Sequence, residues 1–558
     1  MAESHFEAKI LVVDDEKLIR LTISAKLKRA GYESVAVGTV DEAVEILKKD
    51  HTHFGAIISD IVMGAMDGFV FRDIVRGIDK SMPFFFMTAL DPEEGSGFLK
   101  RIVSDPMSYY LPKSVSSEVL INRVKRVIAS RRIEQFIQRK IDEDRQSLEL
   151  AAHVQRSLLP KRAIRTPRGF YSMWWRPKDI VSGDLFEAVP FGQGCYLFVL
   201  GDIQGHGTSA ALAMTAVQSY LKRFKDYDVA QRSIVLDVAN AMQVFFRANL
   251  TDVSYMTALI CAHTPQKGVV EWISCGAPDL IVYDNGSEKR LDVNPEKRGG
   301  LPIGLMPDTV YRECDVVRTP LTKTAVCFAC TDGLQDLSSD SEGLEKLSDD
   351  IIDATAASLM GDAREKGTEA SSLHKFVSAI EAYGYDKYQD DMTLLTFGAT
   401  LSLDGIYSKA IDLTPAGVDA GSQEMAEWCA AQSWPDDLIV RLRLVFEEKL
   451  MNIYDHGFDE RDRMHEVASI RLVRVGDEAR LTVWECGTPE PSLVVAAGDA
   501  DVAFELKNRE MNNHGRGRLI VREICTGIEK NRYCRLNETV YHIPFDATEK
   551  QNMEANSK

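Results

Sequence analysis

Along the first 125 residues, short apolar runs alternate with segments whose apolar positions recur every three or four residues. Four such runs predict buried strands: Lys9–Val13, Ala56–Ser59, Phe84–Met87 and Met107–Leu111. The segments between them have helical spacing, as in Leu18–Ala30 before Gly31. This alternation predicts a doubly wound parallel sheet with functional groups at the carboxyl ends of its strands.

Polar residues follow each of these predicted strands. Asp14 and Asp15 end the first run and Asp60 ends the second, which predicts an acidic pocket suited to Mg²⁺. Thr88 and Lys113 follow the third and fourth runs and could hold a phosphoryl group carried by Asp60. The alternative is that all five residues are strand-end caps and turns.

This ordered set resembles a response-regulator receiver domain of the CheY-like kind, over residues 1–128. The resemblance implies that Asp60 is the phosphoacceptor and that Asp14 and Asp15 are Mg²⁺ ligands. It also makes Thr88 the switch hydroxyl and Lys113 the phosphate-binding base. It places Tyr110 at the aromatic switch position. Two departures concern loops: Pro112-Lys113-Ser114 replaces the family's Lys-Pro, and Met63-Gly64 replaces its Met-Pro.

Residues 129–160 predict a helical connector, because no Gly or Pro occurs between Ser116 and Leu159. A four-three spacing indicates a coiled-coil seam and a homodimer, with positions Ile137, Ile141, Asp144, Leu148, Ala151, Gln155 and Leu158. Asp144 and Gln155 weaken that seam. The alternative is a helix that packs on the domain following it.

Between residues 150 and 400, apolar runs again meet carboxylates. Cys195–Leu200 predicts a buried strand, and four acidic positions lie beside a glycine or a second aspartate: Asp184, Asp202, Asp332 and Asp390. Each alone is ordinary turn chemistry. Together they suit two Mg²⁺ or Mn²⁺ ions about 3.5–4 Å apart that activate a water and neutralise a phosphoryl group.

The motifs S-G-D, G-D-x-x-G-H-G, T-D-G and D-D-M-T, in this order between Ala152 and Phe397, closely resemble the metal-dependent Ser/Thr protein phosphatases of the PPM family. The similar branch contains bacterial sporulation and stress-response phosphatases. The resemblance implies an α/β-sandwich domain at residues 161–400 and a set of metal ligands: bridging Asp184, Asp202 with the Ile203 carbonyl, and Asp332 with Asp390.

Two details accompany this resemblance. Gln204 stands where the usual motif has Ser, and we expect the neighbouring glycines to matter more, because they permit close backbone approach. The connector ends in H-V-Q-R-S-L-L-P, which resembles the leading helix of this phosphatase branch. In that family this helix acts as a switch element.

The pattern Leu438–His456 predicts a helix that carries Glu448 and Asn452 on one face. A carboxylate base and an amide oxygen for Mg²⁺ suit phosphoryl transfer, although exposed pairs at this spacing are common. Glu485-Cys486-Gly487 follows an alternating strand, and Gly515–Leu519 opens a helix whose free N–H groups suit phosphates.

This set is similar to the GHKL ATPases, in particular the anti-sigma-factor serine kinases. The resemblance implies an α/β-sandwich ATPase domain at residues 405–546 that binds ATP and Mg²⁺. It makes Glu448 the general base and Asn452 the Mg²⁺ ligand, with nucleotide loops at Gly487, Gly515 and Gly517. Glu485 replaces the family's adenine-binding Asp, and its extra methylene weakens that contact. Residues 547–558 are expected to be a disordered tail.

The composition restricts the expected partners and cellular location of the protein. The 558 residues include 66 basic and 84 acidic side chains, a net charge of −18, which argues against nucleic acid or an anionic membrane as the main partner. We expect no signal peptide, and no apolar run approaches the roughly 18 residues of a membrane span. The ten cysteines are scattered, and Cys327 and Cys330 are interpreted as core thiols of a cytoplasmic protein.

The expected fold class is therefore multidomain α/β and α+β. The resemblances imply a receiver-controlled serine/threonine phosphatase that dephosphorylates a STAS-type antagonist of an anti-sigma factor, with a C-terminal serine kinase acting on the same antagonist. A sensor histidine kinase would act upstream, and an anti-sigma or sigma factor is a further expected partner. In one alternative the C-terminal domain only binds such a factor or the antagonist. In another the chain is a scaffold with a dead phosphatase, which the four carboxylates disfavour.

Overall fold

The computed structural model describes residues 9–546 except 64–65, 89–95, 167, 192–194, 206, 227–232, 251–254, 285–289, 367–368, 401–403, 459–465, 489–520 and 534–535. It forms two compact units, residues 1–146 and 147–558. The expected tail at residues 547–558 lies outside the described residues.

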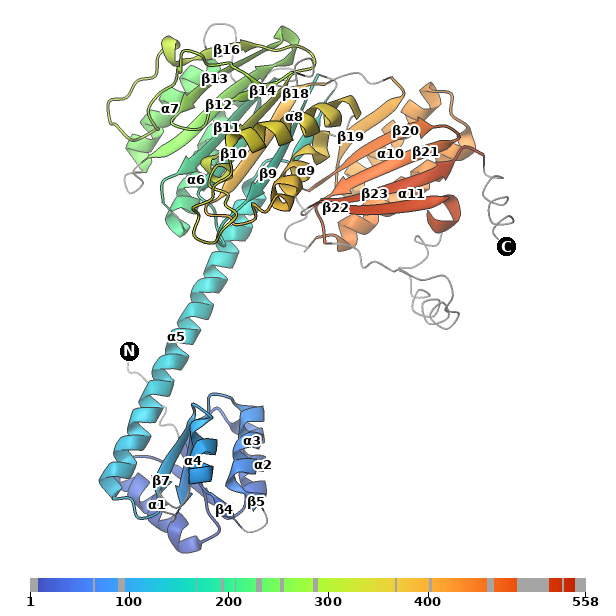
Figure 1. Ribbon diagram of the computed structural model, residues 1–558. Helices are drawn as coiled ribbons and strands as arrows, with labels where there is room; N and C mark the ends of the chain where they lie inside the picture. Colours follow the sequence, from blue (N-terminus) through green and yellow to red (C-terminus); the bar gives the residue numbers. More distant parts are fainter. Residues whose placement is uncertain are drawn as a thin grey trace. The chain divides into compact units, whose positions relative to one another are not determined.

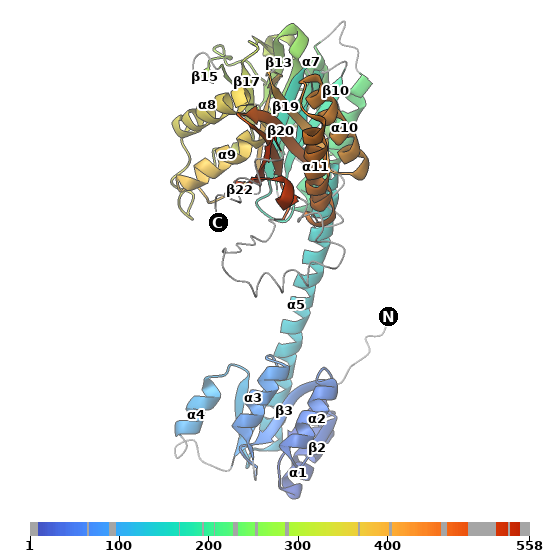
Figure 2. The same cartoon turned by 90° about the vertical axis from the view of Figure 1, so that its right-hand side faces the viewer.

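The first unit is a parallel sheet in the order β2-β1-β3-β6-β7. Its strands are β1 (Lys9–Val13), β2 (Ser34–Val37), β3 (Phe54–Asp60), β6 (Phe84–Thr88) and β7 (Ser108–Pro112). The other elements are α1 (Lys17–Arg29), α2 (Val40–Asp50), α3 (Gly68–Ile78), α4 (Ser96–Val103) and the short hairpin β4 (Val62–Met63) and β5 (Met66–Asp67). Separate apolar cores cover the two faces of the sheet, so the doubly wound receiver fold is confirmed (Figure 2).

Helix α5 (Ser117–Leu158) is the predicted connector, unbroken over 42 residues. Its first turns are buried against the receiver sheet, and Arg131 donates to the Phe54 carbonyl at 2.9 Å and pairs with Asp79. Ile137 and Ile141, the first two positions of the predicted seam, are half exposed in this single chain. Ala152 and Gln155, near the end, are buried in the second unit. The last turns therefore pack on the domain that follows, as the alternative interpretation held.

Two antiparallel sheets form the centre of the next domain, in the orders β10-β11-β12-β13-β16 and β15-β14-β17-β18-β9-β8. The first contains β10 (Asp184–Phe191), β11 (Cys195–Ile203), β12 (Met256–Thr264), β13 (Val269–Cys275) and β16 (Val317–Pro320). The second contains β8 (Ala163–Arg165), β9 (Gly169–Arg176), β14 (Ile281–Tyr283), β15 (Arg290–Leu291), β17 (Val326–Cys330) and β18 (Met392–Ala399).

The two sheets pack face to face, with Phe198 and Phe397 rings 4.7 Å apart in the core between them. Helices α6 (Thr208–Leu221) and α7 (Ile234–Asn249) cover the first sheet, and α8 (Asp349–Lys366) and α9 (Glu369–Ala382) cover the second. Figure 1 shows these layers. The predicted α/β sandwich is confirmed, and Cys327 and Cys330 are buried in it as expected.

The C-terminal domain is a mixed two-layer structure. Its antiparallel sheet has the order β19-β20-β21-β23-β22, with strands β19 (Ile406–Asp412), β20 (Val467–Val475), β21 (Glu478–Glu485), β22 (Gly527–Tyr533) and β23 (Leu536–Pro544). Helices α10 (Pro415–Ala431) and α11 (Asp436–His456) share one apolar core with it. Helix α11 and strand β21 match the elements predicted here.

Two further features concern the backbone and the helices. None of the described peptide bonds is cis, so Pro112-Lys113-Ser114 adopts trans geometry. Within the part of the chain that the structure describes, every helix is too short or too polar to cross a bilayer.

Candidate functional site

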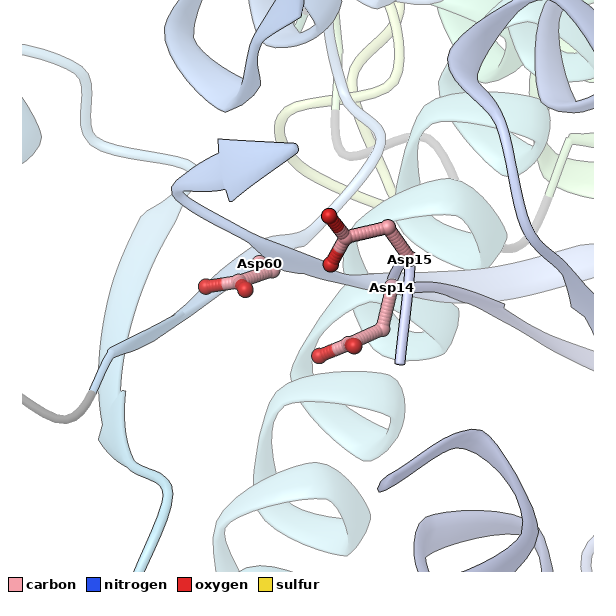
Figure 3. A group of neighbouring side chains, drawn as sticks. All are labelled: Asp14, Asp15 and Asp60. Atoms are coloured by element: carbon pink, nitrogen blue, oxygen red, sulfur yellow. The ribbon is translucent and has the colours of Figure 1, made fainter. Parts of the chain in front are cut away.

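The receiver unit brings its predicted residues to one sheet edge. Asp14 and Asp15 follow β1 and Asp60 ends β3, and their carboxylate oxygens lie within 4.8 Å of one another (Figure 3). The Lys113 ammonium, after β7, donates to Asp60 Oδ2 at 2.7 Å. The Thr88 side chain is buried at the end of β6, and its carbonyl accepts from the Lys113 N–H at 2.8 Å.

The electrostatics of this cluster suit a cation. Burial raises the pKa of Asp14, and its hydrogen bond with the Glu16 N–H and the charge of Lys113 only partly offset this. Asp14 Oδ2 is buried and accepts no hydrogen bond from the described residues, although Lys113 Nζ lies 3.4 Å away. An acidic oxygen with unused acceptor capacity beside two further carboxylates fits Mg²⁺. The carboxylates of Asp14, Asp15 and Asp60 are therefore close enough together to bind one cation.

The phosphatase carboxylates converge from both sheets of the sandwich. Asp184 on β10 is directly opposite Asp202 on β11 in the antiparallel register. Asp332 follows β17, and Asp390 precedes β18, which pairs with β17. The pKa of Asp202 is raised to about 7 by burial and by the charges of Asp332, Asp390 and Asp391. Four residues spread over two hundred positions thus share one electrostatic environment.

Two threonines that the sequence analysis did not assign fix the central carboxylate. Asp184 Oδ2 accepts from Thr331 Oγ1 at 2.9 Å and from Thr393 Oγ1 at 2.6 Å. The Thr393 N–H in turn donates to Thr331 Oγ1 at 2.9 Å. Both threonines belong to the T-D-G and D-D-M-T motifs, so the signal was present in the sequence. Their hydroxyls both donate to the same oxygen of Asp184 and so orient its carboxylate.

Asp391 has a different task from its neighbour Asp390. Its carboxylate accepts from the Lys178 N–H and from the Gly183 N–H, each at 2.7 Å. It therefore ties the S-G-D loop to the start of β18. A Cβ at Gly183 would lie 3.1 Å from the Ile203 carbonyl oxygen, so this glycine allows the close approach of two loop backbones.

Burial of so much negative charge needs compensation. The pKa of Asp184 is raised well above its usual value by burial, against the Thr393 hydrogen bond, and the pKa of Asp332 is also raised by burial. A cation site relieves this cost, because metal binding displaces the protons. Among the described residues these carboxylates do not form a set within 4.8 Å like that of the receiver. Ligands shared between two ions are more widely spread than ligands of one.

The glycines around Gln204 were expected to permit close backbone approach, and this holds for Gly201, where a Cβ would lie 2.7 Å from the Thr257 carbonyl oxygen. The reason is different for the other two glycines of the motif. A Cβ on Gly205 or Gly207 would meet nothing within 4 Å, whereas their φ angles are 108° and 77°. They are needed for the left-handed conformation that turns the chain after β11. His206 of the same motif lies outside the described residues.

Helix α5, the connector, contacts the S-G-D loop directly through Gln155. Its Nε2 donates to the Ser182 carbonyl at 2.6 Å, and its Oε1 accepts from the Ser182 N–H at 3.0 Å. Gln155 is 1% exposed and also lies 3.7 Å from the sulfur of Met214 on α6. Gln155, which was interpreted as weakening a coiled coil, therefore anchors the helix to Ser182, two positions before Asp184.

A second buried carboxylate lies on the other face of β10. Glu187 is 3% exposed, and Oε2 finds no hydrogen-bond partner among the described residues. Burial raises its pKa from 4.5 to about 7, against the opposing charge of Lys222. The folded domain thus holds a proton that the unfolded chain releases, and stability falls as the pH rises from 4.5 to 7.

The C-terminal domain places part of its predicted site together. Glu448 and Asn452 lie on α11, and the end of that helix touches the end of β21, where the Thr488 N–H donates to the Gly457 carbonyl at 2.7 Å. Gly515 and Gly517 lie outside the described residues. Glu448 is exposed.

Glu485 has both carboxylate oxygens engaged. Oε2 accepts from the Gly487 N–H at 2.6 Å, and Oε1 accepts from Asn537 Nδ2 at 3.0 Å. Asn537 also donates to the Gly487 carbonyl at 3.0 Å. The longer side chain thus folds back over its own turn, where it is 4% exposed.

Two family profiles match this chain. Residues 10–125 match the response regulator receiver domain, and residues 192–399 match stage II sporulation protein E (SpoIIE). The chain combines a receiver domain with a SpoIIE-type phosphatase domain. The residues after 400 are covered by neither profile.

Curated relatives resemble the receiver domain. FleR, a response regulator of Pseudomonas aeruginosa, is 30% identical over 160 residues, which is 27% of this chain and 31% of FleR. The response regulator ARR12 of Arabidopsis thaliana is 28% identical over 124 residues, 22% of this chain and 20% of ARR12. The chain thus spans about a fifth to a third of the length of these relatives.

Solved structures are also similar to parts of this chain. The RsbU and RsbW domains of Rv1364c from Mycobacterium tuberculosis are 17% identical, cover 68% of this chain and 96% of that one, and give a TM-score of 0.36. The SiaA-PP2C domain of Pseudomonas aeruginosa is 22% identical, covers 47% of this chain and 98% of that one, and also gives 0.36.

Proposed function

We propose that this chain is a divalent-metal-dependent phosphoserine and phosphothreonine phosphatase whose rate is set by phosphorylation of its receiver domain. The observation that carries the proposal is Asp184, buried opposite Asp202 and oriented by Thr331 and Thr393. Carboxylates that bind metals are typically held in one orientation by hydrogen bonds of this kind.

In this mechanism Asp184 would bridge two Mn²⁺ or Mg²⁺ ions. Asp202 and the Ile203 carbonyl would complete one ligand set, and Asp332 and Asp390 the other. When bound, the ions supply an activated water and neutralise the phosphoryl group. The hydroxyls of Thr331 and Thr393 keep Asp184 in one orientation, and the capture of two backbone N–H groups by Asp391 holds the S-G-D loop in place.

Control is proposed to begin at Asp60, which would accept a phosphoryl group from a sensor histidine kinase with Mg²⁺ held by Asp14 and Asp15. Lys113 would pair with the new charge, and Thr88 would reorient toward it. Helix α5 supports transmission, since it runs without a break from the receiver to Gln155 and the Ser182 backbone. Half-exposed Ile137 and Ile141 support a homodimer along its middle.

The proposed substrate is the phosphorylated form of a STAS-type antagonist of an anti-sigma factor, which places the chain in a partner-switching pathway. The support is the motif resemblance of the phosphatase branch together with the C-terminal domain. We propose as a second activity that Glu448 and Asn452 of that domain transfer phosphate from ATP to the same antagonist. The closed arrangement of Glu485 favours the alternative, a module that binds an antagonist, anti-sigma or sigma factor without phosphate transfer.

The decisive experiment measures hydrolysis of p-nitrophenyl phosphate and of the phosphorylated antagonist in Mn²⁺. Asp184→Asn and Asp332→Asn should nearly abolish both, because each loses a charge from the ligand set. Asp292→Asn, at an exposed position, is the matched control and should keep wild-type rates. Substantial turnover by Asp184→Asn with metal bound would refute the phosphatase assignment.

A further inference from the structure

A segment beside the proposed phosphatase centre exposes several apolar side chains to solvent. In Leu301–Val310, here named the apolar loop, four apolar side chains point into solvent. Their exposed fractions are 49% for Leu301, 40% for Leu305, 55% for Met306 and 65% for Val310. Exposed apolar residues gathered in one segment mark interaction sites more often than isolated ones do.

The backbone of the apolar loop is held from one side by a polar stripe of helix α7. Asn240 exchanges two hydrogen bonds of 3.0 Å with the backbone of Tyr311, at the end of the loop. Gln243 donates to the Met306 carbonyl and accepts from the Gly304 N–H, both at 2.8 Å. Gln243 is only 5% exposed, so its amide is committed to this loop.

The other end of the apolar loop is attached to the sheet that carries the metal ligands. Ile303 and Met256 exchange two backbone hydrogen bonds of 2.8 Å. Met256, on β12, is directly opposite Ile203 of β11, the proposed carbonyl ligand. Since neighbouring strands lie about 4.8 Å apart, the Ile303 backbone lies about 10 Å from that of Ile203.

This distance places the loop within reach of a bound protein. One side of a standard protein interface covers about 800 Å², a patch with a radius of about 16 Å. A phosphoprotein whose phosphate reaches the metals would therefore cover Leu305 and Met306. A small phosphomonoester would not.

We propose that the apolar loop is a substrate-docking surface, which binds apolar side chains of the phosphoprotein about 10 Å from its phosphoserine or phosphothreonine. The proposal rests on the phosphatase function proposed above and adds the class of substrate that it favours. An extended chain advances about 3.4 Å per residue, so the favoured apolar residues lie three or four positions from the phosphorylated one.

The test uses the full-length chain with Mn²⁺ and two phosphoserine peptides. One carries Leu at positions three and four on both sides of the phosphoserine, and the other carries Ser there. The wild-type chain should show a kcat/KM about tenfold higher for the Leu peptide. The double variant Leu305→Ser, Met306→Ser should lose that preference through a higher KM and keep its rate with p-nitrophenyl phosphate. The control Leu291→Ser, at an exposed position on β15, should keep both.

The outcomes separate the two proposals. If the wild-type chain does not hydrolyse p-nitrophenyl phosphate, the phosphatase assignment fails. If it does, but treats the two peptides alike or keeps its preference in the double variant, the docking surface alone is refuted. Conversion of a wild-type dimer into a monomer by the double variant would instead assign the loop to contact between two copies and would also refute the proposal.

Discussion

Replacing Gln155 tests how the connector controls the phosphatase. Gln155→Leu keeps the volume of the side chain and its helical position but removes both hydrogen bonds to Ser182. Ser182 immediately precedes Gly183 and Asp184, so the change acts on the position of the proposed bridging carboxylate without altering any ligand.

The size of the effect follows from burial. Two backbone groups lose their partner in a place where Gln155 is 1% exposed, and each such loss costs about 1–3 kcal/mol. The arrangement that holds Ser182 in place is therefore weakened by about 2–6 kcal/mol. A free-energy change of 1.4 kcal/mol changes an equilibrium constant tenfold, so even about 2 kcal/mol corresponds to a change of about thirtyfold.

The assay is a Mn²⁺ titration of p-nitrophenyl phosphate hydrolysis, with and without a small-molecule phosphodonor for the receiver. Gln155→Leu should need about thirtyfold more Mn²⁺ for half-maximal activity and should no longer respond to the phosphodonor. Gln138→Leu, at an exposed position of the same helix, is the matched control. An unchanged titration and an intact response in Gln155→Leu would show that the contact with Ser182 has no part in control.

Three further predictions concern other parts of the chain. A phosphodonor should label the wild-type chain in a Mg²⁺-dependent, hydroxylamine-labile form, and wild-type labelling of Asp60→Asn would place the site elsewhere. Glu187→Gln should raise the temperature of half-inactivation at pH 8, where the buried charge costs about 3 kcal/mol. The rise should be much smaller at pH 4.5, where the folded residue is protonated and the unfolded one is half ionised, and equal rises at both pH values would contradict this cause. If the C-terminal domain is a kinase, Asn452→Ala should stop transfer of labelled phosphate from ATP to the antagonist, and unchanged transfer would exclude that role for Asn452.

The sequence was sufficient to predict those elements and site residues that depend on a local pattern of residues. The strand-end aspartates and the unbroken connector followed from the spacing of residues, and the sandwich was implied by the family resemblance that the motifs carry. What it did not reveal depends on partners distant in the chain. Gln155 was assigned to a seam because heptad spacing cannot show that Ser182 lies beside it. Likewise, the closure of Glu485 on its own turn depends on Asn537, which the antiparallel register of β21 and β23 places opposite it.

The glycines of G-D-x-x-G-H-G give a related lesson. The motif predicted that glycine is required after β11 but not the reason. Close approach and a left-handed φ angle both select glycine, and only the structure distinguishes them: Gly201 serves the first and Gly205 the second.

The phosphatase centre is built from both sheets of its sandwich, and this links its chemistry to the lifetime of the protein. Asp184 and Asp202 come from one sheet, whereas Thr331 follows β17 and Thr393 lies on β18 of the other. Without cations, mutual repulsion of the buried carboxylates opposes the packing of the sheets, and bound ions stabilise the folded state in proportion to the logarithm of their concentration. A cell short of Mn²⁺ or Mg²⁺ would therefore hold a phosphatase that opens more often and is degraded sooner, so metal supply would set its abundance as well as its rate.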